Sequence, residues 1–414
     1  MELRKVRLGE IATIVNGATP STTDPCNYDG DIVWITPKDL SDQKSKYIKE
    51  GSRNITQKGF DSCSAQLIPP LNILMSSRAP IGLLAINEVE CCTNQGFKNI
   101  IVDKSICDAD YMFYYLHYHM AEVQALGSGT TFKEVSKSSL ERLSVTLPNL
   151  SVQRKIGKLL SDIDRKIALN RWMNATLEAM ARQLYDYWFL QFDFPDAHGK
   201  PYKSSGGKMT WNNQLKRDIP EGWSCGTLSD IANITMGQSP DGSSYNEEGN
   251  GIIFYQGSTD FGIRFPDIRL FTTAPRRFAN KGDILMSVRA PVGVLNIANN
   301  DCCIGRGLSA LSSKIGSMTH LYYTMDLFRL KFVGMNAVGT TFGSITKDEL
   351  HDLPVVRPAH EVLNSFEQIC RPIYDKQMKI GESISTLTRL RTTLLPLLMN
   401  GQVSVAEPYE WGEI

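Results

Sequence analysis

Two stretches of the chain carry the spacing of long amphipathic helices. From residue 151 to about residue 190, apolar side chains recur at alternating steps of four and three, and the pattern returns after residue 361. This heptad spacing lines the apolar side chains along one helix face and predicts a seam that packs against another helix. The seam positions are Ile156, Leu160, Ile163, Ile167, Leu177 and Leu184 in the first stretch, and Phe366, Ile373, Ile380, Ile384, Leu387 and Leu394 in the second.

The two predicted helices are expected to bury their seams on each other as an antiparallel pair. A helix of about 40 residues is about 60 Å long, more than a small domain needs to cover its own core. Asn170 and Asn174 interrupt the first seam opposite Ile380 and Ile384, and a buried Asn can fix the partner and register of paired helices. The alternative that each helix covers only its own domain stays open.

The remaining sequence predicts short strands joined by turns. Residues 1–150 and 221–360 are rich in Gly, Pro, Thr and Asn, with short apolar runs such as IVWI and IIFY. Helices are expected only in a few places there, such as residues 111–124 and 319–333. The fold class is therefore α/β (α+β), with two mixed α/β domains and two long helices.

An internal repeat organises the whole chain. LGEIATIVNGATP (8–20) matches LSDIANITMGQSP (228–240), ILMSSRAPIGLL (73–84) matches ILMSVRAPVGVL (284–295), and GTTFKEVSKSSLERLSVTLP (129–148) matches GTTFGSITKDELHDLPVVRP (339–358). The offset drifts from 220 to 210, as expected of variable loops on a common framework. The repeat predicts a pseudo-two-fold arrangement of two duplicated domains with their helices.

The repeat and the change in composition set the expected boundaries. We expect one domain at 1–150, a long helix at 151–194, a second domain at 221–360, and a second long helix with a tail at 361–414. Residues 195–220 have the Gly, Ser, Lys and Pro content of a linker.

Composition and charge limit the function. Lys plus Arg and Asp plus Glu both number 44, so any polyanion site must be a local patch. No apolar run approaches the roughly 18 to 20 residues of a membrane span, and the polar start lacks a signal-peptide core, so a cytoplasmic protein without a membrane partner is expected. The nine cysteines show no CxxC spacing, which favours reduced thiols, with the doublets at 91–92 and 302–303 buried.

No catalytic constellation is recognisable. The chain has no GxxxxGK[ST] phosphate loop, no [ND]PP[FYW] methyltransferase motif and only scattered histidines. His117 and His119 lie two residues apart on a predicted helix and cannot converge on a metal. We therefore expect no catalytic residue, no metal site and no cofactor.

Two motifs shared by both repeats suit contacts to a polyanion. Both hold a Ser-x-Arg-Ala-Pro-x-Gly turn and a Gly-Thr-Thr-Phe turn, whose amides and hydroxyls suit phosphate oxygens. The candidate phosphate contacts are Arg78, Arg289, Thr130, Thr131, Thr340 and Thr341. A purely structural role is favoured for Phe132 and Phe342, and stays equally open for Arg78 and Arg289.

Base-reading residues are expected where the two repeats differ on the same framework. After the cysteine doublets, Asn and Gln in one repeat are exchanged for Arg in the other, and Asn or Gln suits adenine whereas Arg suits guanine. Any one of these positions could equally be an ordinary surface residue. The candidates are Thr36, Lys38, Asn94, Gln95, Lys98 and Lys133 in the first repeat, and Gln256, Ser258, Thr259 and Arg306 in the second.

With these features the chain resembles the specificity (S) subunit of type I restriction-modification systems. The most specific segments are NRWMNATLEAMARQLYDYWFLQFDFP (170–195), LRTTLLPLLMNGQVSV (390–405) and the GTTF turns with their downstream Leu-x-x-Leu-x-Val-x-x-Pro. The resemblance implies a protein without cofactor or catalysis of its own, which reads a split asymmetric site in double-stranded DNA through two target-recognition domains. It also implies two methyltransferase (M) subunits, which bind S-adenosylmethionine and flip adenine, and two ATP-dependent restriction (R) subunits in the full complex.

Paired helices between two reading domains would act as a ruler for the unread gap between half-sites. Two other functions stay open on the sequence alone. One is a self-sufficient DNA-modifying enzyme with an unrecognised catalytic motif, and the other is a pseudo-dimeric adaptor that binds only proteins.

Overall fold

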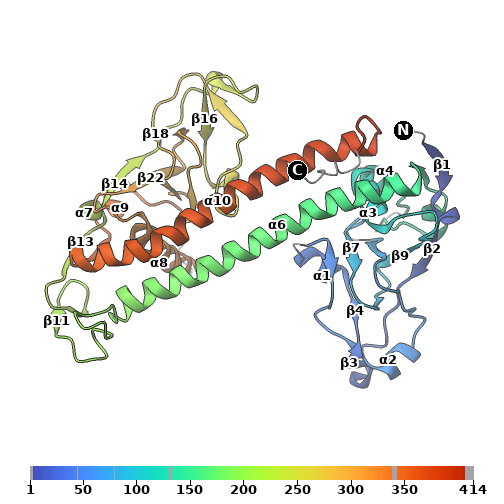
Figure 1. The fold of residues 1–414 in the computed structure, drawn as a ribbon, viewed down its shortest axis with the longest axis horizontal. Helices are drawn as coiled ribbons and strands as arrows, with labels where there is room; N and C mark the ends of the chain where they lie inside the picture. The colour runs from blue at the N-terminus through green and yellow to red at the C-terminus, as the bar shows by residue number, and fades with distance from the viewer. Residues whose placement is uncertain (1–2, 44, 79, 130–132, 338–342, 406–414) are drawn as a thin grey trace, which may run out of the picture. The chain divides into compact units, whose positions relative to one another are not determined.

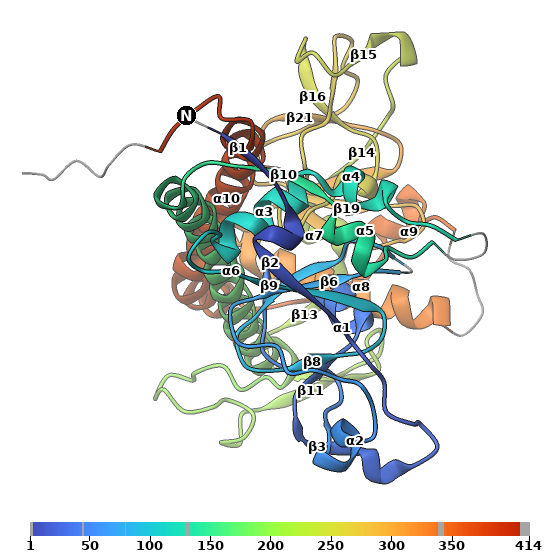
Figure 2. The ribbon, with the colours of Figure 1, turned by 90° about the vertical axis from the view of Figure 1, so that its right-hand side faces the viewer.

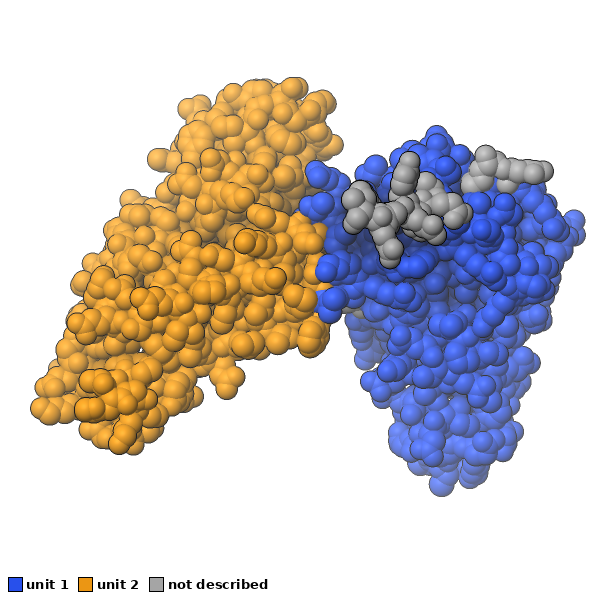
Figure 3. Space-filling view, viewed as in Figure 1, with its two compact units in different colours: residues 1–169, 385–414 blue, residues 170–384 orange. Residues whose placement is uncertain are grey.

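The computed structural model describes residues 3–43, 45–78, 80–129, 133–337 and 343–405. The chain divides into two compact units, one of residues 1–169 with 385–414 and the other of residues 170–384 (Figure 3). Unit 1 combines sequence from both ends of the chain, whereas unit 2 is one continuous segment. Each unit contains one mixed α/β domain and parts of the same two long helices (Figure 1).

The main sheet of unit 1 is covered on both faces. Its strands run in the order β2 (Ala12–Asn16), β9 (Phe97–Val102), β6 (Ile73–Ser76), β7 (Leu84–Asn87) and β5 (Tyr47–Ile48). All neighbours are antiparallel except β5 and β7. Helix α3 (Ala109–Tyr118) lies over one face of this sheet (Figure 2). Ile73 and Met75 join the core formed with α3, whereas Leu74 joins the core of the opposite face. This alternation is expected of a strand with side chains on two buried faces.

Shorter elements complete unit 1. Strand β1 (Arg4–Arg7) pairs with β10 (Ser144–Leu147), and β4 (Trp34–Ile35) pairs with β8 (Cys92–Thr93). The others are β3 (Tyr28–Ile32), α1 (Pro37–Asp42), α2 (Gln57–Asp61), α4 (Met120–Ala125), α5 (Lys137–Glu141) and the 3₁₀ turns η1 (Leu8–Glu10) and η2 (Pro25–Asn27). The helix expected at 111–124 is therefore two helices, because the backbone leaves the α conformation at His119 (φ −92°, ψ 23°).

Unit 2 repeats four of these five strands, those equivalent to β2, β9, β6 and β7. Strands β14 (Ala232–Met236), β22 (Leu308–Ser313), β19 (Ile284–Ser287) and β20 (Leu295–Ile297) are adjacent in this order and antiparallel. Ile284 and Met286 face helix α8 (Met318–Ala337), and Leu285 faces the opposite core, as their counterparts do in unit 1. The duplicated mixed α/β fold expected from the sequence is confirmed.

The other elements of unit 2 include a second sheet in the order β15 (Tyr245–Asn246), β17 (Leu270–Thr272), β16 (Ile252–Tyr255), β21 (Cys302–Ile304) and β18 (Phe278–Ala279). Strand β13 (Ser224–Thr227) pairs with β23 (Pro354–Arg357). Short helical elements are α7 (Leu228–Ile231), α9 (Lys347–His351), η4 (Gly242–Ser244) and η5 (Ser258–Asp260).

Residues 195–220, assigned to a linker by composition, have defined structure in unit 2. They contain a hairpin of β11 (Met209–Asn212) and β12 (Arg217–Pro220). Ile219 is buried in an aromatic cluster, and the Phe194 ring stacks on Tyr202 and Trp223 at centroid distances of 4.7 and 5.1 Å. The glycines serve turns, since Gly199 and Gly206 have φ of 73° and 91°, a region that favours glycine.

Two long helices run through both units. Helix α6 spans Leu150–Tyr185 and continues as a π-helical turn, η3 (Asp186–Leu190), and α10 spans His360–Met399. In unit 2, Asn170 contacts Ser383 and Glu178 contacts Gln377, so α10 runs antiparallel to α6. The antiparallel helix pair expected from the heptads is therefore present.

The seam residues are buried to different degrees. Ile156, Leu160, Ile163, Ile167, Phe366 and Ile380 are buried, whereas Leu177, Leu184, Ile373, Ile384, Leu387 and Leu394 are half-buried. Ile156 and Leu160 also belong to the core of the unit 1 domain, beside Leu398 and Met399 of α10. The helices thus pack on each other and also cover their domain, so the two alternatives weighed above are not exclusive.

In each unit a buried cationic side chain of the α/β domain contacts helix α6. Lys46 Nζ lies 2.5 Å from Asp110 Oδ1 and 2.6 Å from Ser161 Oγ of α6, and burial lowers its pKa despite the nearby carboxylate. Arg264 Nη1 lies 3.0 Å from Glu178 Oε2 of α6. Lys46 and Arg264 occupy equivalent positions in the fold. Their backbone carbonyls accept hydrogen bonds from the amides of Ile86 and Ile297, at 2.8 and 2.9 Å, and these two residues lie in the equivalent strands β7 and β20. Neither was expected from the sequence.

The cysteine doublets are buried in the cores, as expected. Cys91, Cys92, Cys302 and Cys303 are each at most 1% exposed. Burial raises the pKa of the thiols of Cys91, Cys92 and Cys302 to about 12. None of the helices in the described parts of the chain combines the length and apolar character that crossing a membrane requires.

Candidate nucleic-acid interface

The Ser-x-Arg-Ala-Pro-x-Gly turn is held by its serine. Ser76 Oγ donates to the carbonyl of Pro80 at 2.6 Å and accepts from the amide of Leu83 at 2.8 Å. Ser287 makes the same two hydrogen bonds, to Pro291 at 2.5 Å and from Val294 at 2.9 Å. The serine of this motif therefore serves the fold in both units.

The glycine of the turn also serves the fold. Gly82 and Gly293 have φ of 99° and 86°, and a Cβ at these positions would lie 2.2 Å from Met120 and 2.6 Å from Phe332. Arg78 is half-buried and Arg289 is exposed, and neither guanidinium makes a hydrogen bond or ion pair with the described residues. The arginine is thus the charged member of the motif that remains available to an anion.

The turn after each cysteine doublet packs closely on the segment that follows β2 in unit 1 and β14 in unit 2. A Cβ on Gly17 would lie 1.9 Å from the carbonyl oxygen of Asn94, and one on Gly237 would lie 2.1 Å from that of Gly305. Only glycine fits this approach in either unit. Asn94 Oδ1 accepts from the amide of Gly96 at 2.9 Å, which fixes the turn and leaves Gln95 exposed.

Two hydroxyl residues that the sequence analysis missed lie beside these turns. The Thr19 hydroxyl donates to Gln95 Oε1, and Ser239 Oγ accepts from the amide of Arg306 at 3.2 Å. The repeat could have indicated these two residues, because Thr19 and Ser239 occupy the same position in its first matched segment.

The loop after β4 has a structural hydroxyl and an exposed lysine. The amide and hydroxyl of Thr36 donate to Asp39 Oδ2 at 2.7 and 2.6 Å, which caps α1. Burial alone would raise the pKa of Asp39, but hydrogen bonds from Thr36 and Ser52 hold it below its usual value. Thr36 is therefore engaged in the fold, whereas Lys38 is exposed.

In unit 1 three of the candidate loops come together at Gly96. A Cβ there would lie 3.2 Å from Pro37 Cγ and 3.8 Å from Arg78 Nε. The start of α1, the Arg78 turn and the 94–97 turn are therefore neighbours. Lys133, which directly follows the Gly-Thr-Thr-Phe motif, is also exposed and lies close to Gly127.

Unit 2 brings Gln256 and Arg306 together in the same way. A Cβ on Gly307 would lie 2.8 Å from the carbonyl oxygen of Gln256, and one on Gly305 would lie 3.0 Å from its Cα. Because Gly305 and Gly307 have no Cβ, the backbone on both sides of Arg306 can pack against Gln256. Gln256, Thr259 and Arg306 are exposed, and Ser258 is half-buried in η5.

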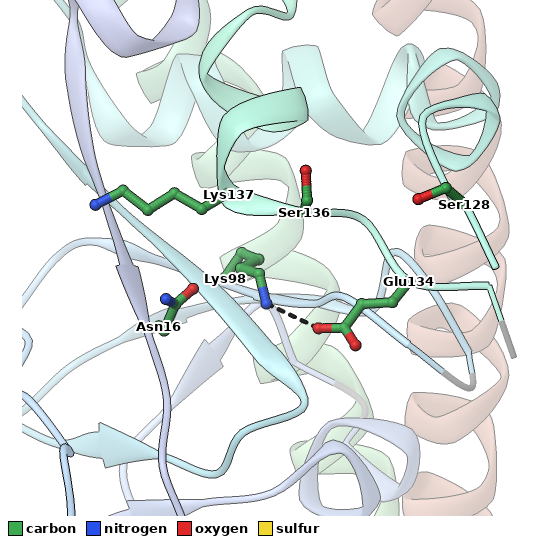
Figure 4. Close-up of a pocket in the computed structure, with 6 residues that line it drawn as sticks. All are labelled: Asn16, Lys98, Ser128, Glu134, Ser136 and Lys137. Carbon is green, nitrogen blue, oxygen red and sulfur yellow. Dashed lines mark hydrogen bonds and ion pairs between the residues drawn. The ribbon is translucent and has the colours of Figure 1, made fainter.

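Lys98 differs from the other candidates. Its side chain is only 9% exposed, and its Nζ lies 2.9 Å from Glu134 Oε1 (Figure 4). The charge of Lys98 is thus paired inside the domain, and its contact with DNA stays a prediction. Four other candidates, Thr130, Thr131, Thr340 and Thr341, lie outside the described residues, as do Phe132 and Phe342.

A comparison with protein-family models decides the family. The model described as "Type I restriction modification DNA specificity domain" matches residues 2–179 and 220–396. The chain belongs to the type I restriction-modification DNA specificity family. Each of its two matches to the specificity domain begins with one α/β domain and ends within one long helix, which agrees with the repeat.

Individual relatives agree with this membership. The specificity chain is 29% identical to the type I restriction enzyme MjaIX specificity subunit of Methanocaldococcus jannaschii, over 98% of the chain and 94% of that protein. It is 31% identical to a putative MjaX specificity subunit of the same organism, over 66% of the chain and 62% of that protein. The crystal structure of the S subunit from M. genitalium has the same fold, with a TM-score of 0.64, 16% identity and 96% of each chain covered.

The family is a DNA-recognition family. Within the described residues of this specificity chain, no group of three or more His, Cys, Asp or Glu side chains is placed to hold a metal ion.

Proposed function

We propose that the chain reads an asymmetric, bipartite site in double-stranded DNA, with one half-site for each α/β domain. The observation that carries the proposal is the repeated set of loops around Arg78 and Arg289. In both units buried serines and closely packed glycines fix the same turns, while the exposed side chains of this set of loops differ. A common framework with different exposed polar groups is what two domains need to read different bases.

Phosphate contacts and base contacts are assigned to different residues. Arg78 and Arg289 would contact phosphates, together with Thr130, Thr131, Thr340 and Thr341. Asn94 and Gln95, with the exposed Lys38 and Lys133, would read bases in the first half-site, and Gln256, Ser258, Thr259 and Arg306 in the second. Thr36 contributes through the α1 cap that positions Lys38.

The helix pair would act as the spacer. The recognition domains are assigned to residues 1–150 and 221–360, and the spacers to 151–194 and 361–414, with 195–220 as the structured connection. The seam residues keep the spacer helices paired, and their length sets the unread gap between the half-sites.

The chain is proposed to catalyse nothing alone and to position two M subunits, which supply S-adenosylmethionine-dependent adenine methylation, and two R subunits in a full complex. Helix α6 offers an exposed apolar contact for such a partner. Trp172 and Met180 are 66% and 53% exposed, and exposed aromatic side chains are frequent anchors of protein interfaces.

The proposal is tested by purifying the chain alone and with its cognate M subunit, and mapping adenine methylation of genomic DNA at single-base resolution. The pair should methylate one bipartite motif with a constant gap, while the chain alone should neither methylate DNA nor bind S-adenosylmethionine. Methylation by the isolated chain would support a self-sufficient enzyme instead. An M complex without a bipartite motif would support an adaptor.

A further inference from the structure

A hollow of about 370 Å³ opens in unit 1 between the end of β2, the start of β9 and the segments on either side of the Gly-Thr-Thr-Phe motif. The residues that line it are all of polar or charged type, and are Asn16, Lys98, Ser128, Glu134, Ser136 and Lys137 (Figure 4). At its centre, Lys98 and Glu134 form the ion pair described above. One carboxylate oxygen of Glu134 faces Lys98, and the other points away from it (Figure 4).

The strand register gives each of these positions a counterpart in unit 2. Lys98 pairs with Met75 and Asn16, and Ser309 pairs with Met286 and Met236 in the equivalent places. The backbone of Glu134 bridges to Arg78, and that of Ser344 bridges to Arg289. The lysine and the glutamate are therefore both exchanged for serine in the second domain.

The joint exchange shows that the shared framework does not need this ion pair. Met75 and Met286 are the same residue at the same place, and the strands around them pair identically. Ser309 is fully buried and Ser344 is exposed, so unit 2 has neither charge here. The pair is one of the differences between the two domains, and it lies beside the arginine proposed to bind phosphate.

A carboxylate at a surface that contacts DNA weakens binding unless another group compensates for its negative charge. Phosphates repel it, so it is tolerated where a nearby cation neutralises it or where it accepts a hydrogen bond from a base amino group. Glu134 has such a cation, because Lys98 is buried beneath it, and its side chain is still 40% exposed. In the major groove, Glu and Asp match the N4 amino group of cytosine.

We propose that Glu134, positioned by Lys98, accepts a hydrogen bond from a cytosine N4 amino group in the first half-site. Glu134 is the specificity-determining residue and Lys98 is a positioning residue. The second domain, with Ser309 and Ser344, reads no cytosine at the corresponding place by this means. The inference rests on the proposed function, and in particular on the assignment of one half-site to each domain.

The test selects bound duplexes from a randomised DNA library with the complex of the full chain and its cognate M subunit. Glu134→Gln keeps the shape of the side chain but adds an amide donor, which matches adenine instead of cytosine. It should weaken the preference for cytosine at one position of the first half-site by about 5- to 150-fold, the range of one good base contact, and favour adenine there. The second half-site should not change.

A matched control is Glu122→Gln on α4, where an exposed carboxylate pairs with His119 at 2.7 Å. It should leave both half-sites unchanged. Lys98→Met should weaken the same cytosine preference as Glu134→Gln, because an unneutralised carboxylate is repelled by the duplex. If Glu134→Gln selects the same motif as the parent complex, the inference is overturned.

The double variant Lys98→Ser with Glu134→Ser guards against misfolding, because unit 2 folds with serine at both places. It should keep the parental melting temperature within a few degrees and lose only the cytosine preference. A variant that melts like the parent and keeps that preference overturns the inference, as does equal loss at both half-sites. Failure of the underlying function is distinct, since the parent complex would then select no bipartite motif at all.

Discussion

Asn170 of α6 donates a hydrogen bond from its Nδ2 atom to Ser383 Oγ of α10, at 3.0 Å. One turn further along α6, Asn174 is also buried, but neither polar atom of its side chain has a partner among the described residues. The two asparagines of the seam therefore have different consequences. Asn170 specifies which part of α10 lies beside it, and Asn174 lowers stability.

This difference can be measured by urea unfolding of the full chain. Asn174→Leu should raise the free energy of unfolding by about 1 to 3 kcal/mol, because it removes a buried amide without partners. Asn170→Leu should lower it by about 1 kcal/mol, because Ser383 then loses its partner. Ser383→Ala is the control and should cost little once Asn170 is replaced. Equal destabilisation by both Asn variants would contradict this account.

Arg78 and Arg289 occupy equivalent turns and should contribute to DNA affinity independently of the base sequence. Arg78→Ala and Arg289→Ala should each weaken binding to all duplexes and reduce the slope of log affinity against log salt by about 1, as expected for one lost phosphate contact. Arg371→Ala is the matched control, since this α10 side chain pairs with Asp375 at 2.9 Å. Titrations at several salt concentrations distinguish the cases, and an unchanged slope with a changed motif would indicate base reading instead.

The exposed side chains of the two turns should act on separate half-sites. Gln95→Ala should cost about 1 to 3 kcal/mol of discrimination in the first half-site, and Arg306→Ala the same in the second, if each contact is bidentate. Methylation mapping with the reconstituted variants measures both. If either substitution relaxed both half-sites equally, the assignment of one half-site to each domain would be wrong.

The spacer can be lengthened without breaking the helix contacts. The Asp164–Arg391 ion pair, at 2.7 Å, shows which segments of α6 and α10 are opposed in unit 1. One heptad inserted after Ile167 and another after Leu387 should keep this pair and the Asn170–Ser383 bond. Each helix gains about 10 Å, which is roughly three base pairs. The bases recognised in each half-site should stay the same while the length of the gap changes. An unchanged gap in an active variant would show that the helix length does not set it.

The exposed aromatic side chain of α6 should matter for assembly and not for folding. Trp172→Ala should weaken the association with the M subunit by about 1 to 2 kcal/mol or more, as for an interface anchor, and leave the melting temperature of the isolated chain nearly unchanged. The exposed Leu390 of α10 offers a comparison, because Leu390→Ala removes less apolar surface. Calorimetric titration gives both affinities, and an unchanged affinity for Trp172→Ala would remove this helix face from the interface.

The sequence predicted what depends on local spacing and on the repeat. The heptads located both long helices, and the matched segments located the Arg78 and Arg289 turns. The ion pair of Lys98 could not be predicted, because its partner Glu134 is 36 residues away and only the fold brings them together. Lys46 and Arg264 were missed because insertions displace them from a common offset, although their carbonyls accept from equivalent amides. The composition of residues 195–220 reflected tight turns and could not indicate the aromatic cluster on which they pack.

Unit 1 contains residues from both ends of the chain, and this affects the order in which the two units can fold during biosynthesis. Leu398 and Met399 at the end of α10 are buried in the same core as Tyr111 and Leu116 of the first domain. During translation, unit 2 has all of its residues when residue 384 has been made, whereas the core of unit 1 still lacks these two side chains. The domain that is synthesised first is thus completed last, and a prematurely terminated chain would keep an apolar groove open to chaperones and proteases.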